Sequence, residues 1–340
     1  MRWESQNVGS DDAGRLPGMG ATVVRRFDAP EALDMRFHEV RTKSALNHVP
    51  PGTSRVPFEW TINPYRGCTH ACVYCFARPT HEYLELDAGR DFEREIIVKV
   101  NVPEVLRKEL ARPSWRGDSI ALGTNTDPYQ WVEGRYKLMR GIWEVMRDFR
   151  NPCSILTKSP LLLRDLDLLQ EIAAVAHVSA CLSVPTLDEK AWRATEPHTP
   201  NPRARLEAVG ELNRAGIPTG VLIAPLMPGV NDAPDQVAAI VEAATEAQAT
   251  YIGGQTLFLR GSVREIYFEW LREHRPDLVP RYERLYAKGA YVPAAKKREI
   301  ELAAGAPWAL RTYPVRERHR GPRLPVAAPR PPRVTQESLF

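Results

Sequence analysis

Three cysteines, Cys68, Cys72 and Cys75, lie within one short stretch in the spacing C-x3-C-x2-C. Thiolates from a single loop can hold three corners of an iron–sulfur cube. A complete cube needs four ligands, so the fourth iron stays open. An open metal position can bind a small molecule directly, and an iron there can also pass it an electron. The spacing therefore indicates a cluster that binds a ligand.

Two other kinds of site would use the same three thiols. One is a zinc site with a fourth ligand from elsewhere, and the other is a cluster that only transfers electrons. Cys153 and Cys181 are the remaining cysteines, and each lies in an apolar, strand-like run. The residues alone leave these alternatives open, although the spacing favours the open cluster.

The elements that must position the thiols begin with a predicted strand at residues 58–63 and a turn at 64–67, directly before Cys68. From there on, short apolar runs alternate with stretches of helical period. Continuously apolar strands that alternate with helices are typical of a parallel sheet covered by helices. The six predicted strands are residues 58–63, 119–123, 154–157, 178–184, 219–224 and 251–259. Residues 95–100 are ambiguous, and an accessory strand outside this series is one interpretation of them.

Ligands of parallel α/β barrels bind at the carboxyl ends of the strands. Polar residues stand at those ends here, as a shared ligand site requires. The candidates are Thr126 and Asp127 after the second strand, Lys158 after the third, Ser183 in the fourth and Ala224 in the fifth. Asp127 is the carboxylate best placed to orient neighbours or substrate. A turn or helix-capping role before Pro128 explains it equally well.

The cysteine motif, with Tyr74 directly before the last cysteine, resembles the cluster motif of radical S-adenosylmethionine (SAM) enzymes. The resemblance implies a [4Fe–4S] cluster on Cys68, Cys72 and Cys75, with SAM bound at the open iron. Reductive cleavage of SAM would yield methionine and a 5′-deoxyadenosyl radical that abstracts hydrogen from a substrate. It also implies a partial (β/α)6 barrel of the TIM type, and a reductant such as flavodoxin or ferredoxin.

Over about residues 36–290 the chain resembles one branch more closely, the spore-photoproduct-lyase-like proteins, often labelled DNA repair photolyases. The stretches that carry this resemblance are residues 67–78, 124–130, 156–159 and 223–225. It implies a lyase-like enzyme for which a nucleic-acid lesion or modified nucleotide is the leading substrate class and DNA a candidate partner. It also implies that the SAM site is lined by Tyr74, Thr126, Lys158, Ser183 and Ala224.

The chain departs from the lyase at two positions. The lyase takes a hydrogen donor from a cysteine just after the second strand, where residues 122–126 contain none. It also uses a tyrosine directly after the last cluster cysteine, where this chain has Phe76. Tyr74 remains, and Cys181 is a candidate substitute donor, although a buried structural thiol explains Cys181 as well. The alternatives are a radical enzyme acting on a protein or small metabolite, and a non-catalytic cluster protein for electron transfer or sensing.

Composition sets the broad class. The chain has 340 residues, of which 43% are apolar and 26% charged, as in ordinary globular proteins. We expect no membrane partner, because no apolar run is long enough to span a bilayer. No secretory signal stands at the start, and the clustered cysteines do not suggest a disulfide framework. These features predict a cytoplasmic protein.

Four segments are expected. They are an N-terminal extension at 1–55, the core barrel at 56–275, a helical segment at 276–312 and a disordered tail at 313–340. The tail is rich in proline and arginine and has too few apolar residues to fold. Residues 311–340 carry seven arginines and two glutamates, whereas the whole chain has a net charge of +4. The basic surplus therefore belongs to the tail, and net charge predicts no basic nucleic-acid face on the barrel.

The tail ends in Gln336, Glu337, Ser338, Leu339 and Phe340. This pentapeptide is similar to the short peptides by which bacterial polymerases and repair proteins bind the replication sliding clamp. In those peptides the glutamine forms hydrogen bonds and the Leu-Phe pair fills an apolar pocket. The similarity makes the clamp a candidate partner, which a pull-down with residues 336–340 deleted would test.

Overall fold

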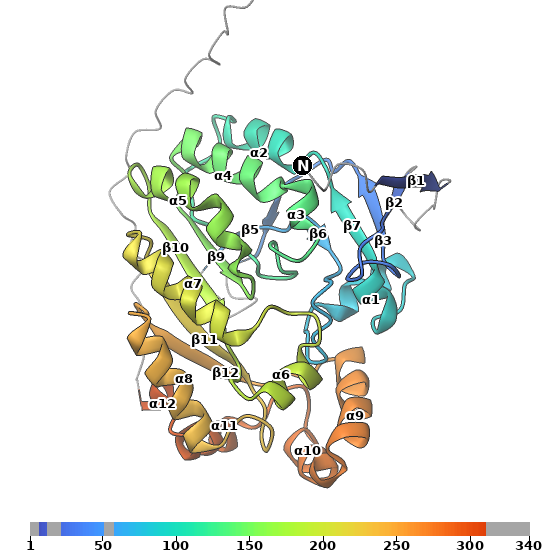
Figure 1. Cartoon of the computed structure of the whole chain (residues 1–340), viewed down its shortest axis with the longest axis vertical. Coiled ribbons are helices and arrows are strands. Elements are labelled where there is room, and N and C mark those ends of the chain that lie inside the picture. The colour runs from blue at the N-terminus through green and yellow to red at the C-terminus, as the bar shows by residue number, and fades with distance from the viewer. Residues whose placement is uncertain (1–6, 12–21, 51–57, 311–340) are drawn as a thin grey trace, which may run out of the picture.

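The computed structural model of the protein describes residues 7–11, 22–50 and 58–310. Its larger sheet has the order β12-β11-β10-β9-β8-β5-β4, in which six strands run parallel in sequence order. Those strands are β5 (Trp60–Ile62), β8 (Ile120–Leu122), β9 (Cys153–Thr157), β10 (Val178–Ser183), β11 (Thr219–Leu226) and β12 (Ile252–Thr256). β4 (Leu46–His48) adds an antiparallel edge beside β5. The sheet does not close on itself, so the predicted partial (β/α)6 barrel is confirmed (Figure 1).

Helices cover the outer face of this sheet. The helices after successive strands are α2 (Val102–Leu110), α4 (Leu138–Phe149), α5 (Leu166–Ala173), α7 (Pro202–Arg214), α8 (Pro234–Glu246) and α9 (Ser262–His274). Figure 1 shows α4, α5, α7 and α8 along the outer side of the sheet. Ile155, Leu182 and Ile223, from three neighbouring strands, are buried in the same apolar core as these helices. Burying each such side chain contributes about 1.5–3 kcal/mol, which holds the strand ends in place.

Further helices lie in the connections and after α9. They are α1 (Arg90–Arg94), α3 (Glu133–Tyr136), α6 (Glu189–Thr195), α10 (Val279–Leu285), α11 (Ala294–Ala303) and α12 (Pro307–Leu310). Four 3-10 turns accompany them: η1 (Arg78–Thr80), η2 (Glu82–Leu84), η3 (Pro160–Asp165) and η4 (Pro276–Leu278). None of the helices in the described ranges has the length and apolar character needed to span a membrane. The predicted tail, with the terminal peptide at 336–340, lies outside the described residues.

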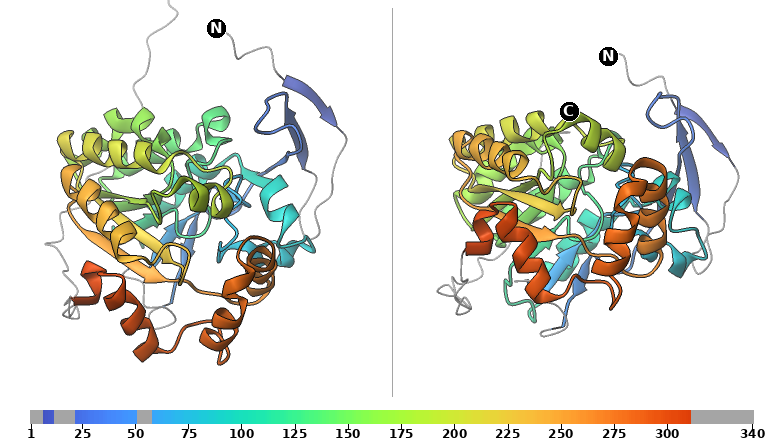
Figure 2. Two further views of the ribbon diagram at one scale, coloured as in Figure 1. Left: turned by 60° about the horizontal axis from the view of Figure 1, so that its bottom comes forward. Right: turned by 90° about the horizontal axis from the view of Figure 1, so that it is seen from below.

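A second, smaller sheet has the order β1-β2-β3-β7-β6. Its strands are β1 (Asn7–Asp11), β2 (Val23–Phe27), β3 (Arg36–Val40), β6 (Tyr65–Arg66) and β7 (Glu95–Lys99). β3 runs parallel to β7, and the sheet has its own apolar cluster around Phe37, Tyr65 and Ile96. Both views in Figure 2 show the darkest blue strands, β1 to β3, apart from the larger sheet, whereas β4 belongs to that sheet. Because β5 belongs to the larger sheet and β6 to the smaller one, the chain passes from one sheet to the other directly before the cysteine stretch.

Candidate active site

The cysteine loop, residues 67–77, connects β6 to η1. Two of its residues have left-handed backbone, Gly67 with φ of 83° and Ala71 with φ of 55°. A Cβ atom at Gly67 would lie only 3.0 Å from the Phe92 carbonyl oxygen, so the loop needs glycine there. Cys68 and Cys72 are each 6% exposed. The turn thus directs two of its thiols into the protein.

The three thiols suit a [4Fe–4S] cluster in number, burial and hydrogen bonding. Backbone N–H groups donate to two of the sulfurs, from His70 and Asp127 to Cys68 and from Ala77 and Arg78 to Cys75. Hydrogen bonds of this kind tune the potential of iron–sulfur clusters. Burial raises the pKa of all three thiols, and the positive charge of bound iron would reverse that effect by favouring the thiolates.

No three Cys, His, Asp or Glu side chains in the described part of the chain converge on one point where a single ion would bind. A cube makes a different demand, because each cysteine binds its own iron atom. The thiols of the loop need only surround such a cluster. The lack of a single-ion site among the described residues therefore does not argue against a cluster on this loop.

The other two cysteines lie in strands of the barrel. Cys153 begins β9 and pairs with Val178, the first residue of β10, so it lies at the end of the barrel away from the carboxyl ends of the strands. Cys181 lies two residues before Ser183 and on the same face of β10, as strand alternation requires. Burial raises the pKa of the Cys181 thiol to about 12, against a hydrogen bond with Tyr251 that lowers it. Its role as a hydrogen donor stays a prediction.

Arg78 binds the middle of the cysteine loop. Its guanidinium donates to the carbonyl oxygens of Cys72 at 3.0 Å and Ala71 at 3.1 Å, within the loop, and to that of Gly89 at 2.9 Å. It also forms an ion pair with Glu93, and the arginine is almost fully buried. A buried cation with this many acceptors fixes the loop in one shape.

Gln130 holds the start of the loop. Its side-chain amide accepts a hydrogen bond from the Thr69 N–H at 2.9 Å and donates to the Gly67 carbonyl at 3.1 Å. His81, which follows the loop, has its Nε2 atom 2.9 Å from the carbonyl oxygen of Glu95, the first residue of β7. Gln130 follows β8, so it ties the loop to the barrel.

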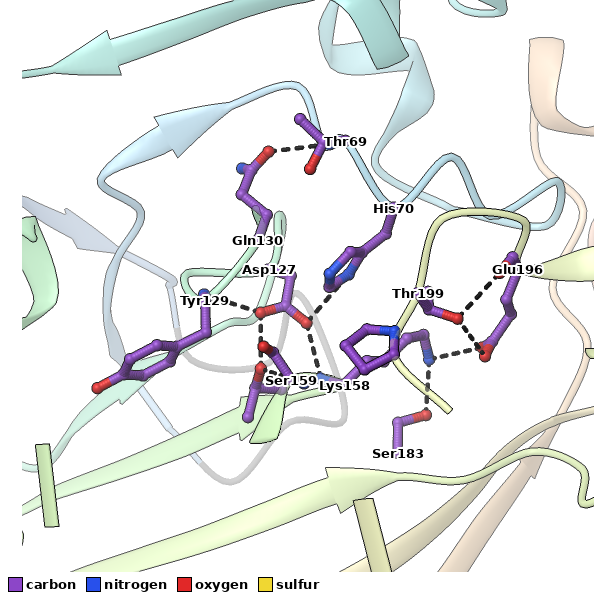
Figure 3. A network of polar contacts seen from close by, with 12 residues as sticks. Thr69, His70, Asp127, Tyr129, Gln130, Lys158, Ser159, Ser183, Glu196 and Thr199 are labelled. Carbon is purple, nitrogen blue, oxygen red and sulfur yellow. Dashed lines mark hydrogen bonds and ion pairs between the residues drawn. The ribbon is translucent and has the colours of Figure 1, made fainter. Parts of the chain in front are cut away.

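Asp127, the carboxylate predicted to orient neighbours or substrate, joins several elements in the structure, and its side chain is 8% exposed. One carboxylate oxygen accepts from the Tyr129 N–H at 2.9 Å and the Thr157 hydroxyl at 2.7 Å. The other accepts from the Lys158 N–H at 2.7 Å and lies 3.4 Å from His70 Nδ1 (Figure 3). These partners join the ends of β8 and β9 to the cysteine loop. The contacts support a positioning role for Asp127.

Three of the predicted SAM contacts come together at the ends of neighbouring strands. The Lys158 ammonium donates to the Ser183 hydroxyl at 2.7 Å, which in turn donates to the Ala224 carbonyl at 3.1 Å. The Lys158 side chain keeps 15% of its surface exposed, so a ligand can reach it. Thr126 is placed differently: its hydroxyl donates to the Tyr65 carbonyl at 3.0 Å, in a buried position against β6.

Glu196 connects the cysteine loop to these residues. Its carboxylate lies 3.1 Å from the Lys158 ammonium (Figure 3). It also accepts a hydrogen bond from the Tyr74 hydroxyl and lies 2.7 Å from the Arg205 guanidinium. Burial would raise the pKa of Glu196, but the charges of Arg205 and Lys158 lower it to about 2. Glu196 is therefore ionised at neutral pH. We call Lys158, Ser183, Ala224, Glu196 and Arg205 the strand-end group.

Sequence reasoning singled out neither Glu196 nor Arg205. Glu196 lies just after α6, a two-turn helix that no sequence pattern predicts, and thus well beyond the end of β10. The available signal is the polar, proline-containing run at residues 195–201, which resembles the runs at the strand ends. Arg205 lies on α7 and looks in the sequence like any exposed helical arginine. Only packing shows that it is buried.

An open parallel barrel with a three-thiol loop at the carboxyl ends of its strands defines a class of iron–sulfur enzyme. Residues 62–269 match the family model described as the Radical SAM superfamily. An uncharacterized protein of Mycobacterium tuberculosis is 46% identical over 298 residues, which are 86% of this chain and 87% of the relative. One of Methanocaldococcus jannaschii is 28% identical over 195 residues, 57% of this chain and 69% of the relative. The chain belongs to the radical SAM superfamily and is a radical SAM enzyme.

Among solved structures, the fold is similar to that of spore photoproduct lyase. The lyase complexed with dinucleoside spore photoproduct has a TM-score of 0.59 at 14% identity, over 79% of this chain and 77% of that chain. A mutant with bound AdoMet and dinucleoside spore photoproduct has a TM-score of 0.53, over 74% and 80%. Identity this low shows a common fold. Radical SAM enzymes use a [4Fe–4S] cluster and SAM, and they need a reductant.

Proposed function

We propose that the three loop cysteines bind the [4Fe–4S] cluster and that Lys158, Ser183 and Ala224 bind SAM beside it. The observation that carries this proposal is the convergence of these three residues at the carboxyl ends of β9, β10 and β11. The same residues are joined to the cysteine loop through Glu196 and Tyr74. SAM bound by these three residues would therefore lie next to the cysteine loop.

Each group of the chain has a separate task. When bound, the cluster supplies the electron that cleaves SAM into methionine and a 5′-deoxyadenosyl radical for hydrogen abstraction. The Lys158 ammonium binds the carboxylate of SAM as a compact point charge. The Ser183 hydroxyl bonds to the ribose, and the backbone at Tyr74 and Ala224 lies against the adenine. A flavodoxin or ferredoxin supplies the electron.

Anaerobic turnover tests this proposal. Reconstituted protein given SAM and dithionite should release 5′-deoxyadenosine and methionine. Cys72→Ala should abolish release and lower the iron content, because one thiolate ligand is lost. Cys153→Ala is the matched control, since that cysteine is also buried but lies in β9, and it should retain both SAM cleavage and iron content. Full iron loading with no SAM cleavage in the wild type would favour the electron-transfer alternative, and bound zinc would favour a zinc site.

We further propose a nucleic-acid lesion or modified nucleotide as the substrate. Just beyond β12, the rings of Phe258 and Tyr291 pair with centroids 4.3 Å apart, and Tyr291 is 61% exposed. Such rings can stack a base, which contributes about 1–3 kcal/mol. Arg260 is exposed beside them and suits a phosphate. The fold shared with spore photoproduct lyase gives independent support.

A comparison of oligonucleotides tests the substrate class. Ultraviolet-irradiated single-stranded DNA should bind and should raise 5′-deoxyadenosine release above the level seen with undamaged DNA. Tyr291→Ala should weaken binding roughly tenfold. Tyr83→Ala is the control, because Tyr83 is 83% exposed but lies in η2. Turnover that no nucleic acid changes would favour a protein or small-metabolite substrate.

The route of hydrogen return must differ from that of the lyase. Phe76 is 57% exposed but has no hydroxyl, and residues 122–126 contain no cysteine. We propose Cys181, together with Tyr74, as the candidate donor. Cys181→Ala should then leave SAM cleavage intact while reducing product formation. Unchanged product formation would show that Cys181 is a structural residue of the barrel wall.

A further inference from the structure

We infer that Glu196 is a positioning residue that orders the Lys158 ammonium in advance to bind the carboxylate of SAM. The inference rests on the proposed cofactor site. It assigns a role to a carboxylate that lies outside the cysteine motif and outside the strands. In this role Glu196 affects SAM binding through Lys158 and has no effect on the cluster itself.

The first argument is the order of the lysine side chain. Three contacts surround the Lys158 ammonium: the Ser183 hydroxyl at 2.7 Å, the Glu196 carboxylate at 3.1 Å and the face of the Tyr74 ring at 5.7 Å. A free lysine side chain carries about 2 kcal/mol of rotamer entropy. Because folding already orders this side chain, SAM binding need not do so, and preorganisation of this kind strengthens binding.

The second argument is that Glu196 itself cannot move. Arg205 is fully buried and donates to Glu196 at 2.7 Å, to the Thr199 hydroxyl at 2.6 Å and to the Ser183 carbonyl at 2.9 Å. The same guanidinium also donates to the Pro200 carbonyl at 2.9 Å. These bonds fasten the segment between α6 and α7 to the end of β10. The Glu196 carboxylate therefore has a fixed position, and the Lys158 ammonium pairs with it there.

The third argument is charge. Within the contact group of Lys158, Arg205 and Glu196, two cations share one carboxylate. A buried charge is costly unless it is paired. Because Glu196 is divided between two partners, the exposed part of Lys158 still favours a further anion. The carboxylate of SAM has the charge that completes this group.

A double-mutant cycle tests the inference. SAM affinity would be measured by calorimetry on the anaerobically reconstituted wild type, Glu196→Gln, Lys158→Met and the double variant, with iron content measured in each. Each single change should raise the Kd for SAM on the order of tenfold or more. Since Glu196 acts through Lys158, the double variant should bind no more weakly than Lys158→Met alone. Iron content should stay at the wild-type level.

Two controls separate positioning from other effects. Thr199→Val removes a hydroxyl that contacts Glu196 and Arg205 but not Lys158, and it should change the Kd less than twofold. S-adenosylhomocysteine has the carboxylate of SAM but lacks the sulfonium charge. Glu196→Gln should weaken both ligands by the same factor if it acts on the carboxylate contact.

The inference is overturned if the losses of SAM affinity in the two single variants add in the double variant. It is also overturned if Glu196→Gln weakens binding of SAM but not of S-adenosylhomocysteine, or if Thr199→Val weakens SAM binding as much as Glu196→Gln does. If Glu196→Gln does not fold, a variant that carries both Glu196→Gln and Arg205→Gln replaces it in the cycle. This variant has no buried arginine without a partner. Failure of the proposed function is distinguishable. In that case the wild type binds no SAM, or Lys158→Met leaves the Kd unchanged.

Discussion

The cysteine loop and the strand-end group are held by different kinds of contact. Arg78 and Gln130 bind the loop mainly through its backbone carbonyl and N–H groups. Lys158 and Glu196 are held mainly by other side chains, and Arg205 bonds both to side chains and to backbone carbonyls. Backbone contacts determine the shape of the loop, whereas side-chain contacts determine where charge stands at the strand ends. Cluster assembly and SAM binding should therefore respond to separate substitutions.

The largest effect is expected for Arg78→Met, which removes every guanidinium bond to the cysteine loop. We expect the free energy of unfolding to fall by about 3–5 kcal/mol, because Glu93 and several carbonyls lose their partner. Iron bound per chain should fall as well. Urea unfolding of the metal-free chain and iron analysis measure these changes. Arg90→Met, at an exposed position on α1, is the control, and an equal loss there would contradict the special role of Arg78.

The next effect concerns the strand-end group and depends on pH. The pKa of Glu196 is lowered to about 2, below its ordinary value in the unfolded chain. Its ionised form therefore stabilises the fold above about pH 4.5, on the order of 3 kcal/mol, and this contribution is lost as pH falls from there toward 2. Wild type and Glu196→Gln should differ most at pH 7 and converge as the pH approaches 2 in urea unfolding. A difference that stays constant with pH would show that charge is not the cause.

A smaller effect is expected for Gln130→Leu, which leaves the Thr69 N–H and the Gly67 carbonyl without their side-chain partner. We expect the free energy of unfolding to fall by about 1–3 kcal/mol, because buried polar groups are left unpaired. Iron loading should decrease, but the Kd for SAM, measured per loaded cluster, should not change. An increased Kd at full loading would break the separation between the two regions.

The smallest effect is expected for Thr199→Val, on the rim of the strand-end group. It should cost about 1 kcal/mol in unfolding free energy, since one neutral hydrogen-bonding group is lost. Iron content should be that of the wild type. A loss of iron in this variant would mean that the strand-end group also supports the cluster, and the two regions would then have to be treated as one.

Local features of the chain were predictable from its sequence. The three cysteines are close in sequence, so any loop brings them near each other. The six strands of the barrel are short apolar runs that alternate with stretches of helical period, and this alternation is visible without a structure. Lys158, Ser183 and Ala224 could be predicted as neighbours, because parallel strands place their carboxyl ends at one edge.

Only the tertiary structure decided the contacts between distant parts of the chain. β3 pairs with β7 in a second sheet, and the Tyr74 hydroxyl meets Glu196, 122 positions away. An arginine such as Arg205 has the same local pattern whether it is buried or exposed. Burial and pairing follow from how the helices and loops pack, and packing joins residues whose separation along the chain carries no periodic signal. Local sequence therefore determined the cysteine motif and the strands. Tertiary packing determined where the charged groups around them lie.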